Sequence, residues 1–194
     1  MEGRVLSIGL GRVATGRPAV SAAQDRAIFD RLFEEYSSPI HNYVLRMVGD
    51  ADRAADITQD TFIKAYRKLD TLTDETSARA WLYRIATNTA IDEMRRRRWV
   101  SPMGSDEERH HERPDERPGP EAQVIGGMLD ERIQRALMQL RPNHRQCLIL
   151  SDLEDMSAQQ IGEVMGLSYG AVRTLLCRAR GEMRRQLTVE GLVR

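Results

Sequence analysis

Arginine and small polar residues recur on one side of a helix predicted near the end of the chain. Five arginines and a single glutamate lie between residues 168 and 186. A helix that docks in the major groove of DNA needs a short polar face that is basic near its start. On the helical period the outward residues are Tyr169, Gly170, Arg173, Thr174, Cys177, Arg178 and Arg180. This face favours DNA binding over the alternative, an ordinary solvated face of arginines.

The residues around this face have the pattern of a helix-turn-helix between 157 and 183. Ser157 is a good N-cap for a first helix, and Ser168 is a good N-cap for a second. Gly166 lies between them, where glycine adopts the left-handed conformation of a tight turn at low cost. The apolar side of the hairpin consists of Ile161, Val164, Val172, Leu175 and Leu176. Such a hairpin would hold its second helix against DNA.

A second group of arginines ends the fourth helix predicted in the first half of the chain. Residues 95–98 are all arginine, and Arg84, Asn88 and Trp81 lie further back, with Trp99 at the end. Arginines at a helix end can simply interact with the last carbonyls and the helix dipole. Arginines, amides and a flat ring on one helix also suit contacts with phosphates and unpaired bases. The residues alone leave both interpretations open.

Helical periodicity covers the first half of the chain after residue 23. Apolar residues recur at helical spacing in four segments, which begin near Gln24, at Pro39, near Asp52 and near Ser77. Proline fits the first turn of a helix, so Pro39 predicts a new helix there. Residues 1–23 show no sustained period and predict a flexible arm. Four amphipathic helices with short loops predict a compact bundle over 24–99.

The composition changes at residue 100. Residues 100–125 hold four of the seven prolines and seven acidic residues against three arginines, so we expect a flexible acidic linker with no core. Helical patterns resume at about 123–140, 143–153, 157–165 and 169–187, which gives a second domain over 126–194. Strand-like alternation is missing from both halves. The sequence predicts an all-α fold of two small helical domains.

The overall composition excludes several classes of protein. The 194 residues carry 29 basic and 29 acidic side chains, with no run of about 18 apolar residues that could span a membrane. The opening residues lack the apolar core of a secretory signal, and two cysteines cannot build a disulfide framework, so we expect a cytoplasmic protein. Clustered metal ligands, a phosphate-binding glycine loop and a nucleophile with its base are all missing. We therefore expect no metal, no cofactor and no enzymatic activity.

Three segments taken together resemble the signatures of a known family. They are Asp56 to Leu69, Ala80 to Trp99 and the helix-turn-helix, in this order and with a linker between the domains. Over about 24–187 the chain resembles an extracytoplasmic-function (ECF) sigma factor of the sigma-70 family, a subunit of bacterial RNA polymerase. The resemblance implies that 24–99 corresponds to sigma region 2 and 126–194 to sigma region 4.

The resemblance assigns the third helix of the first domain to polymerase binding. In the family this helix is the main contact with the clamp of the largest subunit, and the matching residues are Asp56, Gln59, Asp60, Phe62 and Lys64. The implied partners are core RNA polymerase, through its clamp and flap, promoter DNA, and an anti-sigma factor that holds the free protein inactive. The acidic linker of relatives follows the RNA path of the polymerase.

The resemblance also divides the DNA contacts between two promoter elements. The loop 70–79 would hold a flipped-out base of the minus-ten element, and Asn88 would contact a neighbouring base. The residues assigned to this element are Trp81, Arg84, Asn88, Arg95 and Arg96. The second helix of the helix-turn-helix would contact the minus-thirty-five element. Its residues are Gly170, Ala171, Thr174, Cys177 and Arg178 toward bases, and Arg173 and Arg180 toward phosphates.

One alternative belongs to another class of protein. A one-component transcription regulator would join a helical sensing domain to a helix-turn-helix and bind DNA without the polymerase. Such a sensor has no need of the 56–69 helix or the 81–99 segment. It should instead carry an apolar ligand pocket or a dimerisation helix, and the sequence indicates neither.

Overall fold

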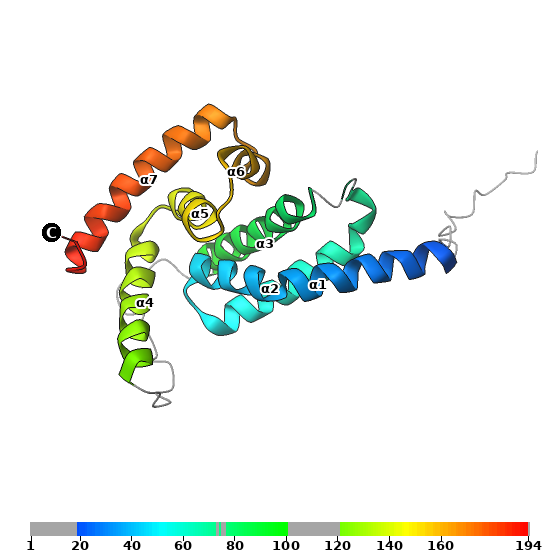
Figure 1. Ribbon diagram of the computed structural model, residues 1–194, viewed down its shortest axis with the longest axis horizontal. Helices are drawn as coiled ribbons and strands as arrows, with labels where there is room; N and C mark the ends of the chain where they lie inside the picture. The colour runs from blue at the N-terminus through cyan, green and yellow to red at the C-terminus, as the bar shows by residue number, and fades with distance from the viewer. Residues whose placement is uncertain (1–18, 73, 75–76, 101–120, 194) are drawn as a thin grey trace, which may run out of the picture.

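Helices joined by short turns make up the described structure. The computed structural model describes residues 19–72, 74, 77–100 and 121–193, and it contains no strand within these ranges (Figure 1). The first domain comprises α1 (Ala19–Val48), α2 (Ala51–Arg67), the 3-10 turn η1 (Leu69–Thr71) and α3 (Ala78–Val100). The second comprises α4 (Glu121–Gln139), α5 (Pro142–Leu148), the π-helical turn η3 (Ile149–Leu153), α6 (Ala158–Met165) and α7 (Tyr169–Val189). The predicted all-α fold is confirmed.

The helix boundary predicted at Pro39 is wrong, because α1 continues through the proline. Proline cannot donate to the carbonyl four residues earlier, and this usually kinks or ends a helix. Burial of the side chains that follow compensates, since Ile40, Tyr43 and Val44 are all fully buried. α1 also begins at Ala19, inside the predicted arm of residues 1–23. Residues 1–18 lie outside the described residues.

The predicted linker over 100–125 is longer than the segment between the helices. α3 continues to Val100 and α4 begins at Glu121, so both ends of the predicted linker are helical. Residues 101–120 lie outside the described residues, and the flexibility of this segment stays a prediction.

The predicted helix-turn-helix consists of α6 and α7, and local hydrogen bonds fix both helix starts. Ser157 accepts a bond from the backbone N–H of Gln160, whose side chain accepts one from the N–H of Ser157, which makes a capping box. Gly166 ends α6 with a left-handed φ of 68°. Ser168 then caps α7 by accepting from the N–H of Ala171 at 3.3 Å. These contacts set the direction in which α7 leaves the turn.

The two domains pack against each other and share a continuous core. Tyr83 and Ala86 of α3 belong to the same buried cluster as Leu148 of α5 and Ile161 of α6. α3 contacts α6, and α1 contacts α4 and α5, so α5 and α6 lie between α7 and the first domain (Figure 1). The sequence predicted two separate bundles, because periodicity shows that a helix face is apolar but not which face it meets.

A buried arginine joins the two domains at this contact. Arg145 is 5% exposed and donates to the carbonyls of Leu137, Met138 and Leu140 around the end of α4. It also donates to the carbonyl of Met47 in α1 at 2.5 Å. Burial lowers the pKa of Arg145 to about 10, so the group stays charged at neutral pH. One guanidinium thus satisfies carbonyls that two helix ends leave without partners.

Candidate functional site

The outer side of α7 is exposed over the first three turns of the helix. Val172, Leu176 and Ala179 face the core, so the opposite side points to solvent. All seven residues predicted to contact DNA from this helix are exposed. We call this surface the α7 face, which consists of Gly170, Ala171, Arg173, Thr174, Cys177, Arg178 and Arg180. The structure brings every member of the predicted set onto one accessible surface.

Arginines continue along the same side of α7 beyond this face. A shallow hollow is lined by Arg173, Leu176, Cys177, Arg180, Gly181 and Arg184. The three arginines are seven and four residues apart, and these spacings place them on one side of a helix. A line of positive charge along a helix suits the row of phosphates in a nucleic-acid backbone.

Arg180 already has a carboxylate partner within the protein. Its guanidinium donates to Asp152 of η3 at 2.6 Å and to the Ser151 hydroxyl at 3.1 Å. Partial burial raises the pKa of Asp152, but the hydrogen bonds from Arg180 and Ser151 outweigh it and bring that pKa below its ordinary value. The carboxylate is therefore ionised at neutral pH, and it competes with any phosphate that approaches the same edge of the Arg180 guanidinium.

The start of α3 presents a second polar surface. Arg84 and Asn88 are exposed and lie one helical turn apart. Trp81 is half-buried, and its indole N–H donates to the hydroxyl of Thr71 at 3.1 Å. This bond ties the start of α3 to η1, so the loop and the helix predicted to meet the minus-ten element are held together. Within that loop, residues 73, 75 and 76 lie outside the described residues.

The end of α3 carries the predicted arginines. Arg95 and Arg96 are both exposed, and Arg96 pairs with Glu93 of the same helix. Positive side chains at a helix C-terminus also interact favourably with the helix dipole. The side chains of residues 97–100, which include Trp99, lie outside the described residues. Arg95 and Arg96, the two residues predicted to contact DNA at this end of α3, are therefore accessible.

The residues predicted to bind the polymerase divide into two groups. Asp56, Gln59 and Asp60 form an exposed polar row on α2. Phe62 is only 4% exposed, and Lys64 is half-buried and donates to the hydroxyl of Thr89 in α3 at 3.1 Å. The resemblance assigned all five residues to polymerase binding, and that assignment stays a prediction. Phe62 and Lys64 make contacts within the domain, so only the other three form an exposed row.

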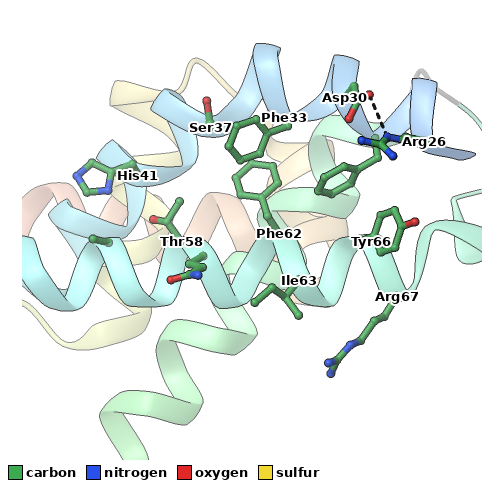
Figure 2. Close-up of a pocket in the computed structure, with 13 residues that line it drawn as sticks. Arg26, Asp30, Phe33, Ser37, His41, Thr58, Phe62, Ile63, Tyr66 and Arg67 are labelled. Atoms are coloured by element: carbon green, nitrogen blue, oxygen red, sulfur yellow. Dashed lines mark ion pairs between the residues drawn. The ribbon is translucent and has the colours of Figure 1, made fainter.

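An apolar groove lies beside the polar row, between α1 and α2 (Figure 2). Its volume is about 860 Å³. Figure 2 shows Phe33 of α1 facing Phe62 of α2, with ring centres 4.9 Å apart in an edge-on arrangement. Phe33, Ile63 and Tyr66 remain 48%, 42% and 53% exposed. Large apolar side chains that stay this exposed next to polar residues mark a docking surface for another protein.

The sequence did not reveal this groove. Helical periodicity groups Phe33 with the apolar residues of the first predicted helix and places Tyr66 on the buried side of the third, but both side chains are about half exposed. A signal was present in α2, where Phe62, Ile63, Ala65 and Tyr66 are all apolar. Four such residues within five positions cover more of a helix surface than one packed face, so one or more of them must point outward.

The two cysteines differ in burial. Cys147 is buried, and this burial raises its pKa to about 11, whereas Cys177 is exposed. In the part of the chain that the structure describes, no group of three or more His, Cys, Asp or Glu residues could hold a metal ion. None of the described helices is long and apolar enough to cross a membrane.

Two protein-family models match the chain. The Sigma-70 region 2 model matches residues 32–100, and the Sigma-70, region 4 model matches residues 130–183. The first match covers the surface of α3 and the groove except for Arg26, Phe29 and Asp30. The second covers the helix-turn-helix and the α7 face. The two matched segments together contain every residue that the sequence placed in a binding surface.

Similar proteins cover most of the chain. The ECF RNA polymerase sigma factor SigL of Mycobacterium tuberculosis strain H37Rv is 31% identical over 183 residues, which cover 92% of this chain and 99% of SigL. The ECF RNA polymerase sigma factor SigE of Mycolicibacterium smegmatis is 32% identical over 88% of this chain and 66% of SigE. The solved structure of the sigma factor RpoE from Bartonella quintana, in complex with the anti-sigma factor NepR, has a TM-score of 0.66 at 24% identity. It covers 83% of this chain and 97% of that chain, a likeness of fold.

Proposed function

The chain belongs to the ECF family of RNA polymerase sigma factors. From this premise we propose which of its surfaces bind the polymerase and which bind promoter DNA. The protein binds core RNA polymerase, directs it to specific promoters and helps to open the DNA. The observation that carries this function is the presence of both sigma-70 regions, in order, in a chain that covers 99% of SigL.

The α7 face contacts the minus-thirty-five element. Gly170 and Ala171 are small, so the start of the helix can lie deep in the major groove. Arg178 has the reach and the paired donors to bind the O6 and N7 atoms of a guanine. Arg173 and Arg180 contact phosphates, which position the helix without contributing sequence information. The hollow along α7 supports this division, since its arginines continue away from the base-contacting end.

α3 and the loop before it contact the minus-ten element. Opening DNA there requires at least one base to leave the stack, which costs a few kcal/mol that the protein must offset with new contacts. Asn88 offers an amide to a base edge, and Trp81 is fixed beside the loop by its bond to Thr71. Arg84, Arg95 and Arg96 bind the neighbouring backbone. Because these are phosphate contacts, they set affinity more than sequence preference.

The polar row on α2 and the apolar groove together bind the clamp of the polymerase. Burial of the exposed aromatic and aliphatic side chains supplies most of the affinity, as is usual at the centre of a protein interface. Asp56, Gln59 and Asp60 at the edge of the groove orient the partner by charge and hydrogen bonds. The second domain meets the flap of the polymerase.

The protein works in the cytoplasm, without a cofactor and without catalysing a reaction, in a stress or envelope response. An anti-sigma factor controls the free protein, a proposal supported by family membership and by the RpoE–NepR complex of similar fold. The alternative of a ligand-sensing regulator is not favoured by the groove. In the groove, Phe33, Ile63 and Tyr66 are about half exposed. A pocket for a small ligand would enclose most of the ligand surface, and such open walls would not.

Transcription from genomic DNA tests the function directly. Core RNA polymerase with the protein and fragmented genomic DNA should give transcripts whose defined start sites share paired upstream motifs. Those starts should be missing without the protein. Specific DNA binding by the protein alone, with no new start sites, would instead support a one-component regulator.

Variants of the polar row test the polymerase assignment in the same assay. Gln59→Lys with Asp60→Lys should weaken binding to core polymerase and reduce the new transcripts, because the charge at the edge of the groove is reversed. Glu131→Lys, an exposed acidic position on α4, is the matched control and should transcribe normally. Unchanged polymerase affinity of the double variant would contradict the clamp assignment.

A further inference from the structure

A short acidic turn leads into the helix-turn-helix and lies between the two domains. Residues 151–155 read Ser-Asp-Leu-Glu-Asp, with three carboxylates and no basic side chain. The N–H of Glu154 donates to the carbonyl of Ile149 at 3.0 Å, and Asp155 has a positive φ of 50° that non-glycine residues seldom adopt. These backbone features define the path of the turn, and the contacts of its side chains orient the carboxylates. We call residues 151–155 the acidic turn.

The acidic turn holds an arginine of the second domain through Asp152. One carboxylate oxygen accepts from a terminal nitrogen of Arg180 at 2.6 Å, and the other accepts from its Nε at 3.3 Å. Two parallel bonds of this kind are also the way in which arginine binds a phosphate group. The exposed carboxylate therefore occupies one of the two edges of the guanidinium that a phosphate could use.

The acidic turn also holds an arginine of the first domain, through Glu154. A terminal nitrogen of Arg79 lies 3.7 Å from the Glu154 carboxylate, and the same nitrogen donates to the Glu154 carbonyl. The hydroxyl of Tyr83 donates to this carboxylate as well. Arg79 ends the loop assigned to the minus-ten element. One short segment thus contacts an arginine from each of the two DNA-binding regions.

The packed arrangement of the domains cannot match a promoter. α3 contacts α6, and three residues separate α6 from α7. Packed helices lie about 8–10 Å apart and α6 is about 12 Å long, so the start of α7 lies within about 25 Å of α3. Elements near positions −10 and −35 are about 25 base pairs apart, about 85 Å along DNA at 3.4 Å per pair. The domains must separate before both elements can be bound.

We propose that the acidic turn is an internal substitute for DNA phosphate, which occupies Arg79 and Arg180 in the free protein and adds to the shared core in holding the two domains closed. DNA has to displace one carboxylate from each arginine, so the free chain binds DNA weakly. Separation of the domains releases Arg79 from Glu154 and restores its charge to the minus-ten surface. The inference rests on the proposed function, which assigns these two surfaces to DNA binding.

DNA binding by the full chain, without polymerase, tests the substitution. Asp152→Asn and Glu154→Gln should each bind a random-sequence duplex of about 40 base pairs roughly three- to tenfold more tightly than the parent. The slope of log affinity against log salt should steepen by about one for each released arginine. Glu163→Gln, an exposed position on α6, removes the same charge outside the turn and measures the general electrostatic effect.

Distances between spin labels test the closing role. Labels at Arg67→Cys and Val189→Cys, in a Cys177→Ser background, report on the separation of the domains in the free protein. Glu154→Gln and Arg79→Glu should shift the distances to longer values. Asp152→Asn should leave them unchanged, since Asp152 and Arg180 belong to one domain. The double variant Arg79→Glu with Glu154→Arg should restore the parental distance, which would show that loss of this contact caused the shifts in the single variants.

The outcomes separate this proposal from the proposed function. Turn variants that bind DNA no more tightly than Glu163→Gln would overturn the phosphate substitution. Parental distances in both Glu154→Gln and Arg79→Glu would overturn the closing role. Neither measurement uses polymerase or a promoter, so failure of either one would leave the transcription result unaffected. Failure of the transcription assay would likewise leave these two measurements unaffected.

Discussion

The groove between α1 and α2 and the α7 face are both exposed, but their chemistry is opposite. The groove presents Phe33, Ile63 and Tyr66, which are apolar and about half exposed. The α7 face presents arginines, a hydroxyl and a thiol on a helix whose apolar side is turned inward. Apolar burial depends little on salt, whereas binding of arginine to phosphate falls steeply as salt rises. The two surfaces should therefore differ most clearly in their response to ionic strength.

The two surfaces also depend on the fold in different ways. The groove exists only because two helices lie side by side, and it draws residues from both. The α7 face belongs to one helix and needs only the turn that aims it. Its charge, however, is partly neutralised by the contact between Arg180 and Asp152. A surface made by packing is present as soon as the domain folds, while a surface made of charge can be masked by a neighbouring carboxylate.

The largest expected effect comes from placing a charge in the groove. Ile63→Asp should weaken binding to core polymerase by about 2–4 kcal/mol, because an ionised carboxylate would be buried where an apolar side chain is expected. The loss should persist at high salt, since it does not come from charge attraction. Titration of labelled core polymerase at two salt concentrations measures it.

Val189→Asp is the matched control for this prediction. Val189 is apolar and 80% exposed at the end of α7, away from the groove. Its replacement should leave polymerase affinity unchanged. If the loss of affinity in Ile63→Asp disappeared at high salt, the polymerase would bind the groove through charge attraction. The contrast between the two surfaces would then be lost.

The next effect concerns the α7 face. Arg178→Ala should cost about 1–3 kcal/mol at the preferred upstream element if the side chain binds a guanine. Arg173→Ala should weaken binding to every sequence alike and reduce the salt slope by about one, as expected for a phosphate contact. Competition binding with matched and mutated elements distinguishes the two. Equal losses on all sequences for Arg178→Ala would make it a phosphate contact too.

Two glycines in the helix-turn-helix should differ in their effect on stability. A Cβ at Gly162 would lie 2.6 Å from the carbonyl oxygen of Leu167, so Gly162→Ala should cost about 1–3 kcal/mol or more. Gly166 has open space around it but a positive φ of 68°, so Gly166→Ala should cost only about 1 kcal/mol. Urea unfolding of both variants gives the two values. The reverse order would mean that the backbone angle constrains the turn more than its packing does.

The smallest effect is chemical and leaves the fold intact. A thiol reagent at pH 8 should modify Cys177 and spare Cys147, which is buried with a pKa raised to about 11. Bound DNA should slow the reaction at Cys177, since the residue lies on the α7 face. Mass spectrometry of the modified peptides measures both rates. Equal rates with and without DNA would place Cys177 outside the contact surface.

The sequence determined most of the helices, the helix-turn-helix and the exposed residues on α7, although it divided α1 at Pro39. Caps at Ser157 and Ser168 and the glycine at 166 act through neighbouring backbone groups, so local sequence is enough to place them. Periodicity likewise identified the outward side of α7, because one helix with a clear apolar side has only one way to face its core.

Only the tertiary structure decided the groove, the contact between the domains and the acidic turn. Periodicity could not tell that Phe33 and Tyr66 stay exposed, or that α1 continues through Pro39, because burial by other helices settles both. Glu154 and Arg79 are 75 residues apart in the chain, and no local pattern links them. Local interactions are encoded by spacing in the sequence, whereas contacts between distant helices depend on how all of the apolar faces pack at once.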